Sequence, residues 1–179
     1  MLDIEKCCLV VVDVQGKLAQ LMYNKVDLFK NITILIKAAK LLALPIIWCQ
    51  QCPEALGPTV PQIAESLEGV EPINKASFSC CGAEEFTRKL GALNRRQVLL
   101  CGIEAHVCIY QTAVDLLKKA TQVTVVADAV SSRTLENKRI AIDKIRNSGA
   151  DISSVEMVLF ELLRTAEHPH FKAIAGLIK

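Results

Sequence analysis

Aromatic residues are scarce in this 179-residue chain, at 4% of the sequence, and the net charge at pH 7 is only +2. The chain therefore lacks the basic excess of a typical nucleic-acid-binding protein and the stacking surface of a single-strand binder. Glycine and proline are also few, at 8 and 6 residues, which excludes collagen-like and low-complexity sequences. These absences favour a globular protein that acts on a small molecule and has no nucleic-acid partner.

The sequence also lacks an apolar run long enough to cross a membrane. The longest run, Leu41 to Cys49, contains Pro45 and is far shorter than the roughly 20 residues that a spanning helix needs. The first residues, MLDIEK, carry charges of both signs, and the short apolar run after them ends at Asp13, unlike a secretory signal. We therefore expect a cytoplasmic protein with no membrane partner.

Hydrophobic residues make up 51% of the chain, which is enough to form a sizeable core and fits one domain over 1–179. Short apolar runs, which predict buried strands, alternate with amphipathic segments, which predict helices. This alternation indicates a doubly wound, Rossmann-like α/β domain of three layers with a mainly parallel six-stranded sheet. The segment 50–61 holds three prolines and a glycine, which predicts a loop. The expected strands are 7–12, 46–48, a short one leading into Asn74, 97–101, 123–127 and 151–153, and the expected helices are 26–42, 83–90, 107–119, 135–147 and 155–164.

Cysteine is the abundant residue that needs an explanation, with 8 copies. Disulfide frameworks are typical of short secreted domains that lack a core, so we expect reduced thiols here. Cys49 and Cys52 form a CxxC, which is compatible with half of a zinc site or with a redox pair. A structural zinc needs about four ligands, and the only other paired cysteines, Cys80 and Cys81, are adjacent in sequence. A redox CxxC normally opens a helix, whereas this one follows a strand, so we expect neither a metal nor a cofactor.

Three reactive side chains follow predicted strands and would therefore meet at one edge of the sheet. Asp13 follows the strand 7–12, Lys75 follows the third strand, and Cys108 lies just after the strand 97–101. In such sheets, ligands bind outside the carboxyl ends of the strands, where the strand order reverses. Taken singly, these residues also fit a turn former, a surface lysine and a buried packing thiol. Together they fit an activated thiol, because a helix amino terminus and a nearby lysine both stabilise a thiolate.

The strings around these residues resemble a known family. VVDVQ contains Asp13, INKASFS contains Lys75, and CGIEAHVCIYQT contains Cys108. Over nearly its whole length the chain resembles the isochorismatase-like hydrolases, the family that includes nicotinamidases and N-carbamoylsarcosine amidases. The strings GIEAHVC, QQCPEALGPTVP and VVADAVSSR most resemble the subgroup called isochorismatase domain-containing proteins. The resemblance implies that Asp13, Lys75 and Cys108 form a catalytic triad.

The resemblance also implies roles for individual residues. Cys108 would attack a carbonyl as a thiolate, Asp13 would accept the thiol proton, and Lys75 would balance the charge. The cis peptide of the family corresponds to the bond between Ile103 and Glu104, and the backbone amides of Glu104 and Cys108 would form the oxyanion hole. A structural role is the alternative for His106. The residues expected to line the substrate pocket are Gln15, Gln51, Phe78, Ser79, Ala105 and His106.

Departures from the family narrow the expected activity. Nicotinamidases bind a metal through an Asp and two His around the loop after the second strand, where this chain has WCQQCPEALG. We therefore expect a metal-independent cysteine hydrolase that acts on a small amide, ureide or related acyl substrate. The alternatives are isochorismatase-type ether hydrolysis, in which the resemblance implies an Asp and a Lys without a cysteine nucleophile, and a catalytically weak binding or scaffold protein that keeps the pocket. The resemblance further implies a homo-oligomer, either a dimer or larger.

Overall fold

The computed structural model describes residues 1–179 and contains a six-stranded sheet in the order β3-β2-β1-β4-β5-β6, in which every neighbouring pair is parallel. The predicted doubly wound α/β architecture is therefore confirmed. None of the helices combines the length and the apolar character that crossing a membrane requires. The strands are β1 (Cys7–Val12), β2 (Ile46–Gln51), β3 (Pro72–Lys75), β4 (Gln97–Ile103), β5 (Gln122–Ser131) and β6 (Asp151–Ser153). The helices are α1 (Gly16–Gln20), α2 (Lys25–Leu41), α3 (Pro53–Leu56), α4 (Pro61–Ser66), α5 (Glu84–Leu93), α6 (Tyr110–Lys118), α7 (Leu135–Asn147), α8 (Val155–Leu163) and α9 (Phe171–Leu177).

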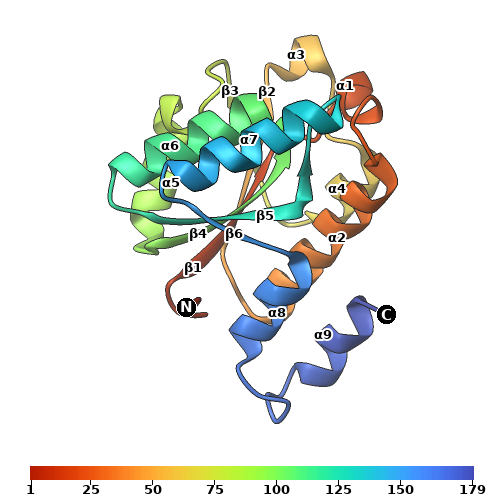
Figure 1. Cartoon of the computed structure of the whole chain (residues 1–179), viewed down its shortest axis with the longest axis vertical. Helices are drawn as coiled ribbons and strands as arrows, with labels where there is room; N and C mark the ends of the chain where they lie inside the picture. The colour runs from red at the N-terminus through yellow and green to blue at the C-terminus, as the bar shows by residue number, and fades with distance from the viewer.

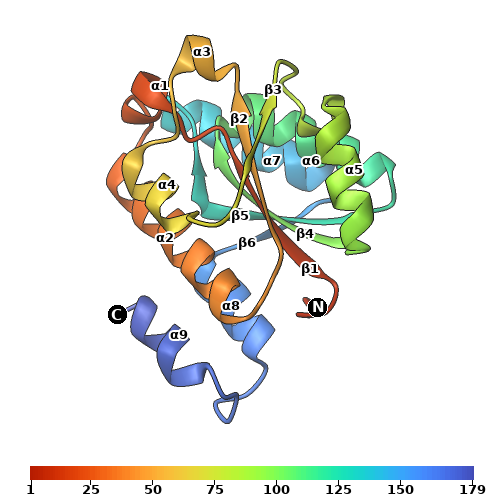
Figure 2. The same ribbon diagram turned by 180° about the vertical axis from the view of Figure 1, so that it is seen from behind.

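Helices cover both faces of the sheet, which makes three layers (Figures 1 and 2). Helices α5, α6 and α7 cover one face, and α2, α4 and α8 cover the other, where α9 packs against α2. Successive side chains of a strand point to opposite faces, so Leu9 enters the core beneath α2 while Val10 enters the core beneath α6. Every residue of β1 and of β4 is buried, which explains why these strands read as continuous apolar runs rather than alternating ones.

The predicted loop over 50–61 is wrong in two respects. Strand β2 continues through Gln51, and the chain then forms α3 before α4 begins. Proline favours loops in general, but Pro53 and Pro61 each occupy the first position of a helix, where the missing N–H has no intrahelical partner to lose. Strand β5 is also longer than expected, because it continues to Ser131 after a register shift beside Gly102.

Strands β1 and β4 lie side by side at the centre of the sheet, at the point where the strand order reverses. Gly102 lies near the end of β4 with φ of 117° and pairs with Val12. A Cβ atom on Gly102 would lie 2.0 Å from the backbone oxygen of Val12, so only glycine fits. The close approach of the two strands brings the residues that follow β1 next to the residues that follow β4.

Candidate active site

The three sequence-predicted reactive residues meet at the carboxyl ends of the central strands. Asp13 directly follows β1, Lys75 is the last residue of β3, and Cys108 lies in a π-helical turn over Ala105–Ile109 that leads from β4 into α6. All three are buried, with 2%, 5% and 7% of their surfaces exposed. A cavity of about 290 Å³ lies away from these residues, at the amino ends of β4, β5 and β6. The site is therefore defined by side-chain chemistry and not by cavity size.

The Lys75 ammonium group is surrounded by oxygen atoms. It donates to Asp13 Oδ2 and to Gln51 Oε1 at 2.7 Å each, and to the carbonyls of Ser77 and Phe78 at 3.1 Å each. Burial by itself lowers the pKa of Lys75, but the charge of Asp13 and the two nearby thiols outweigh it, so the pKa is raised. An ammonium group has three N–H donors and no acceptor, and here four oxygens surround it. Lys75 is thus a fixed cation at neutral pH.

The Asp13 carboxyl group has one occupied oxygen and one without a partner. The backbone of Asp13 has φ of 54°, which is uncommon for a residue other than glycine, and the Asp13 N–H donates to the carbonyl of Cys49 at 3.0 Å. Oδ2 accepts from Lys75, while Oδ1 is fully buried with no hydrogen-bond partner. Burial raises the pKa of Asp13 and the Lys75 cation opposes this, with a net upward shift. The carboxylate is therefore a stronger base than usual.

The Cys108 thiol lies close enough to Asp13 for each group to shift the pKa of the other, although no aligned hydrogen bond joins them. Burial raises the pKa of Cys108 and the charge of Asp13 raises it further, while Lys75 lowers it. The net shift is upward, so the group is a neutral thiol at neutral pH. Nucleophilic attack by Cys108 therefore requires a base that removes its proton, and the neighbouring carboxylate of Asp13 is the candidate.

The turn between β4 and α6 has an irregular backbone. The peptide bond between Ile103 and Glu104 is cis, and the Glu104 carbonyl accepts the N–H groups of Val107 and Ile109 at 3.1 and 3.2 Å. The Glu104 carboxylate accepts from the Arg133 backbone N–H at 3.2 Å and from Arg133 Nε at 3.1 Å. The sequence did not predict this ion pair between a buried carboxylate and an arginine side chain that is 56% exposed, and its only signal was the arginine in VVADAVSSR.

The residues expected to line the pocket divide into two groups. Phe78 is 55% exposed, and partly buried His106 shares a hydrogen bond of 2.9 Å between its Nδ1 and Ser132 Oγ. The buried residues are Gln15, Gln51, Ser79 and Ala105. The side-chain nitrogen and oxygen of both glutamines are occupied by hydrogen bonds within the protein. Phe78 and His106 are accessible to a ligand, whereas Gln51 contacts Lys75 and Gln15 contacts Gln51.

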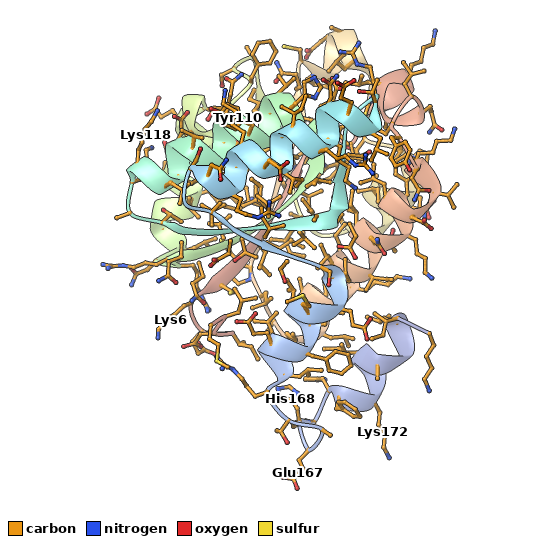
Figure 3. All side chains as sticks on the ribbon, in the orientation of Figure 1. Lys6, Tyr110, Lys118, Glu167, His168 and Lys172 are labelled. Atoms are coloured by element: carbon orange, nitrogen blue, oxygen red, sulfur yellow. The ribbon has the colours of Figure 1, made fainter.

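The remaining cysteines include one feature that the sequence did not reveal. All eight are free thiols. Cys80, in a short 3-10 turn over Cys80–Gly82, lies beside Cys49, and this neighbouring thiol and the charge of Lys75 lower the pKa of Cys80. No group of three or more His, Cys, Asp or Glu side chains has the arrangement to hold a metal ion. His168 and His170 directly precede α9, and His168 lies at the end of the molecule far from Tyr110, which begins α6 (Figure 3).

The fold and this cluster define a three-layer α/β protein with an aspartate, a lysine and a cysteine gathered at the switch point of a parallel sheet. A model of the isochorismatase domain matches residues 7–157. Isochorismatase domain-containing protein 2 of Danio rerio is 38% identical over 95% of this chain and 85% of the relative. The secreted isochorismatase effector Isc1 of Phytophthora sojae is 42% identical over 96% of this chain and 83% of the relative.

A solved structure agrees with these sequence relatives. The structure of MAR1 ribonuclease from Caenorhabditis elegans superimposes with a TM-score of 0.94 and 35% sequence identity, covering 99% of this chain and 91% of that one. The chain therefore belongs to the isochorismatase-like hydrolase family, as its sequence resemblance indicated.

Proposed function

We propose that this protein is a metal-independent cysteine hydrolase that cleaves a small amide, ureide or related acyl substrate with Asp13, Lys75 and Cys108. The observation that carries the proposal is the buried Asp13 carboxylate, which lies near the Cys108 thiol and keeps one oxygen, Oδ1, without a hydrogen-bond partner. A buried acceptor without a donor is costly, and the need to receive a proton is one reason for which such an atom is retained. The other carboxylate oxygen is held by Lys75, which keeps the group in place.

The first half of the reaction forms an acyl-enzyme. Asp13 accepts the Cys108 proton while the sulfur attacks the carbonyl carbon of the substrate, and the carbonyl oxygen becomes an oxyanion. The backbone amides of Glu104 and Cys108 stabilise this oxyanion. When the intermediate collapses, the C–N bond breaks and the departing nitrogen takes the proton from Asp13, which leaves a thioester on Cys108.

The second half of the reaction releases the acid. Asp13, again a carboxylate, takes a proton from a water molecule that attacks the thioester carbon. The C–S bond then breaks, and the thiol of Cys108 regains its proton from Asp13. The sum of the two halves is one amide and one water converted into one carboxylic acid and one amine, with the enzyme unchanged. The Lys75 cation stays charged throughout and offsets the negative charge that develops near it.

Thiol reactivity tests the proposal without a known substrate. Cys52 and Cys81 are partly exposed, whereas Cys108 is 7% exposed, so a reagent guided by exposure alone would modify Cys52 and Cys81 first. Iodoacetamide carries an amide group and an electrophilic carbon, so we expect it to alkylate Cys108 faster than either of them at neutral pH. Peptide mapping at short reaction times measures the order. Slower labelling of Cys108 than of the exposed thiols would refute an activated nucleophile.

Substrate panels separate the alternatives. A cysteine hydrolase loses turnover of amides, ureides and esters in Cys108→Ala, while ether hydrolysis of the isochorismatase type depends on Asp13 and Lys75 and survives that substitution. A binding or scaffold protein shows equal, background turnover in wild type and variant. The family relationship and the presence of all three residues favour the first outcome.

The name of the Caenorhabditis elegans protein raises RNA as a further substrate to test. We propose instead a small substrate with no nucleic-acid partner, because the chain has a net charge of only +2 and the site is closely packed. Salt-dependent binding of RNA to this chain, measured by fluorescence anisotropy, would overturn this part of the proposal.

Three further proposals concern the whole chain. We propose one isochorismatase-like domain over 1–179, because Ile174 of α9 is buried in the same core as α2 and α8. We propose a cytoplasmic location, which keeps the eight thiols reduced. We propose a homo-oligomer of two or more copies, supported by exposed Leu21, Tyr23 and Val26 around the start of α2. Light scattering at micromolar concentration tests the last point.

A further inference from the structure

We propose that Gln51 is a positioning residue, which holds the Lys75 ammonium against Asp13 and is itself held by Gln15. This inference deepens the proposed function and rests on it. Both glutamines are buried, with Gln51 9% exposed and Gln15 0% exposed, so their side chains contact the protein and not the solvent. Their polar atoms instead form a chain of hydrogen bonds that ends on Lys75.

The first link of this chain is the Gln51 side chain. Its Oε1 accepts from Lys75 Nζ at 2.7 Å, and its Nε2 donates to the carbonyl of Ala76 at 2.7 Å. An ammonium group can only donate and a carbonyl can only accept, so these two partners fix which end of the amide faces Lys75. Gln51 thus connects the lysine to the backbone that directly follows it in the chain.

The second link is the Gln15 side chain, which fixes the backbone of Gln51. Gln15 Oε1 accepts the Gln51 N–H at 2.6 Å, and Gln15 Nε2 donates to the carbonyl of Gln51 at 3.1 Å and to that of Gly57 at 2.8 Å. Gln15 is only two residues from Asp13. The end of β2, the residues after β1 and the end of β3 are therefore held together by two side-chain amides.

The position of Gln51, beside the Lys75 ammonium, requires a neutral amide. A carboxylate in place of Gln51 would also accept from Lys75, but its charge would compete with Asp13 for the cation and repel a thiolate. An apolar side chain would leave the ammonium with one fewer acceptor and leave the carbonyl of Ala76 without this donor. Glutamine supplies an acceptor and a donor without adding charge.

The position of Lys75 matters for Cys108. Burial is the largest effect on the Cys108 thiol and raises its pKa, the carboxylate of Asp13 and the nearby Cys80 raise it further, and the cation of Lys75 lowers it. A lysine that is free to move away from the site would lose part of this effect. Loss of the Gln51 contact should therefore raise the pKa of Cys108 and slow its alkylation.

The test compares two glutamines that are neighbours in β2. Gln50 is 7% exposed, and its Nε2 donates to Thr59 Oγ1 at 2.8 Å, away from Lys75. Gln50→Leu thus removes a buried amide of the same size whose side chain has no hydrogen bond to Lys75, Asp13 or Cys108. We expect Gln51→Leu to slow the alkylation of Cys108 by iodoacetamide about tenfold at each pH below its pKa, which corresponds to one pKa unit, and Gln50→Leu to leave the profile unchanged.

Two outcomes distinguish this inference from the proposed function. If Cys108 of the wild type is not alkylated faster than the exposed thiols, the proposed function fails. If wild-type Cys108 is alkylated first but Gln51→Leu and Gln50→Leu share the wild-type profile, only the positioning role of Gln51 is overturned. Should Gln51→Leu fail to fold, Gln51→Asn keeps a neutral amide on a side chain one methylene shorter, which withdraws the acceptor from Lys75 and should also slow the alkylation. An unchanged profile in Gln51→Asn would likewise overturn the inference.

Discussion

Replacing Lys75 by methionine should destabilise the protein strongly and in a pH-dependent way. Methionine keeps an unbranched side chain in a position where the lysine side chain is 0% exposed, so the loss of apolar packing is small. The substitution removes the cation from four oxygens, and only one of these, in Asp13, belongs to a group that can ionise. Asp13 would then be a buried carboxylate without a counter-charge.

The magnitude follows from the cost of that buried charge. Removing one partner of a buried ion pair typically costs about 3 to 5 kcal/mol. Asp13 can avoid this cost by taking up a proton, and holding a proton on a group of ordinary pKa 3.8 at about pH 7 costs about 4 kcal/mol. At about pH 5 the same proton costs only about 1.6 kcal/mol. The cost of the unpaired charge and the cost of protonating Asp13 both predict that the free energy of unfolding falls by about 4 kcal/mol at neutral pH. This is a large part of the about 5 to 15 kcal/mol that stabilises most proteins.

Urea unfolding followed by the fluorescence of Trp48, the only tryptophan, measures this effect. The folded variant holds Asp13 with a pKa raised above its unfolded value, so its stability is present at low pH and is lost as the pH rises. We expect the difference between wild type and variant to grow by about 2 to 3 kcal/mol from pH 5 to pH 7. The variant Asp13→Asn/Lys75→Met, with both charges removed, should recover most of the loss. A loss below about 1 kcal/mol, or one that is equal at both pH values, would refute the reasoning.

Two further predictions concern the backbone and the nucleophile. Gly102→Ala should cost more than about 3 kcal/mol in the same unfolding assay, because its Cβ would lie 2.0 Å from the oxygen of Val12 at a φ of 117°. Gly91→Ala, on a helix and with nothing within 4 Å of its Cβ, should instead stabilise by about 0.5 to 1 kcal/mol, and equal effects of the two would be contrary to this account. Cys108→Ala should change the free energy of unfolding by less than about 1 kcal/mol, because the thiol forms no aligned hydrogen bond, and should abolish turnover of the substrate panel. A large loss of stability in Cys108→Ala would mean that lost activity reports unfolding.

Much of the fold could be predicted from the sequence because buried parallel strands leave a simple pattern. The runs at 7–12 and 97–101 are apolar on both faces, and the structure places them side by side at the centre of the sheet. The errors came from residues with two roles. Pro53 and Pro61 start helices, and the extension of β5 to Ser131 depends on a register shift that propensity does not encode.

The reactive residues of the candidate site could be predicted from the sequence, but the groups that hold them in place could not. Asp13, Lys75 and Cys108 followed from their places after strands and from the strings around them. The partners of Lys75 did not, because the chain after β3 turns back and presents the carbonyls of Ser77 and Phe78 to the ammonium. Such contacts depend on the path of a short loop, and no periodic pattern of residue types records that path.

The proton-accepting role of Asp13 is the central claim, and the alkylation rate of Cys108 in Asp13→Asn tests it most directly. Asparagine keeps the size of the side chain and removes both the base and the negative charge. If Asp13 were only a charge near the thiol, its removal would lower the pKa of Cys108 and alkylation would become faster. If Asp13 accepts the proton, alkylation at neutral pH becomes slower, with the labelling of Cys52 in the same sample as the internal reference. We predict slower alkylation of Cys108 in Asp13→Asn, and a rate equal to or above that of the wild type would contradict the account.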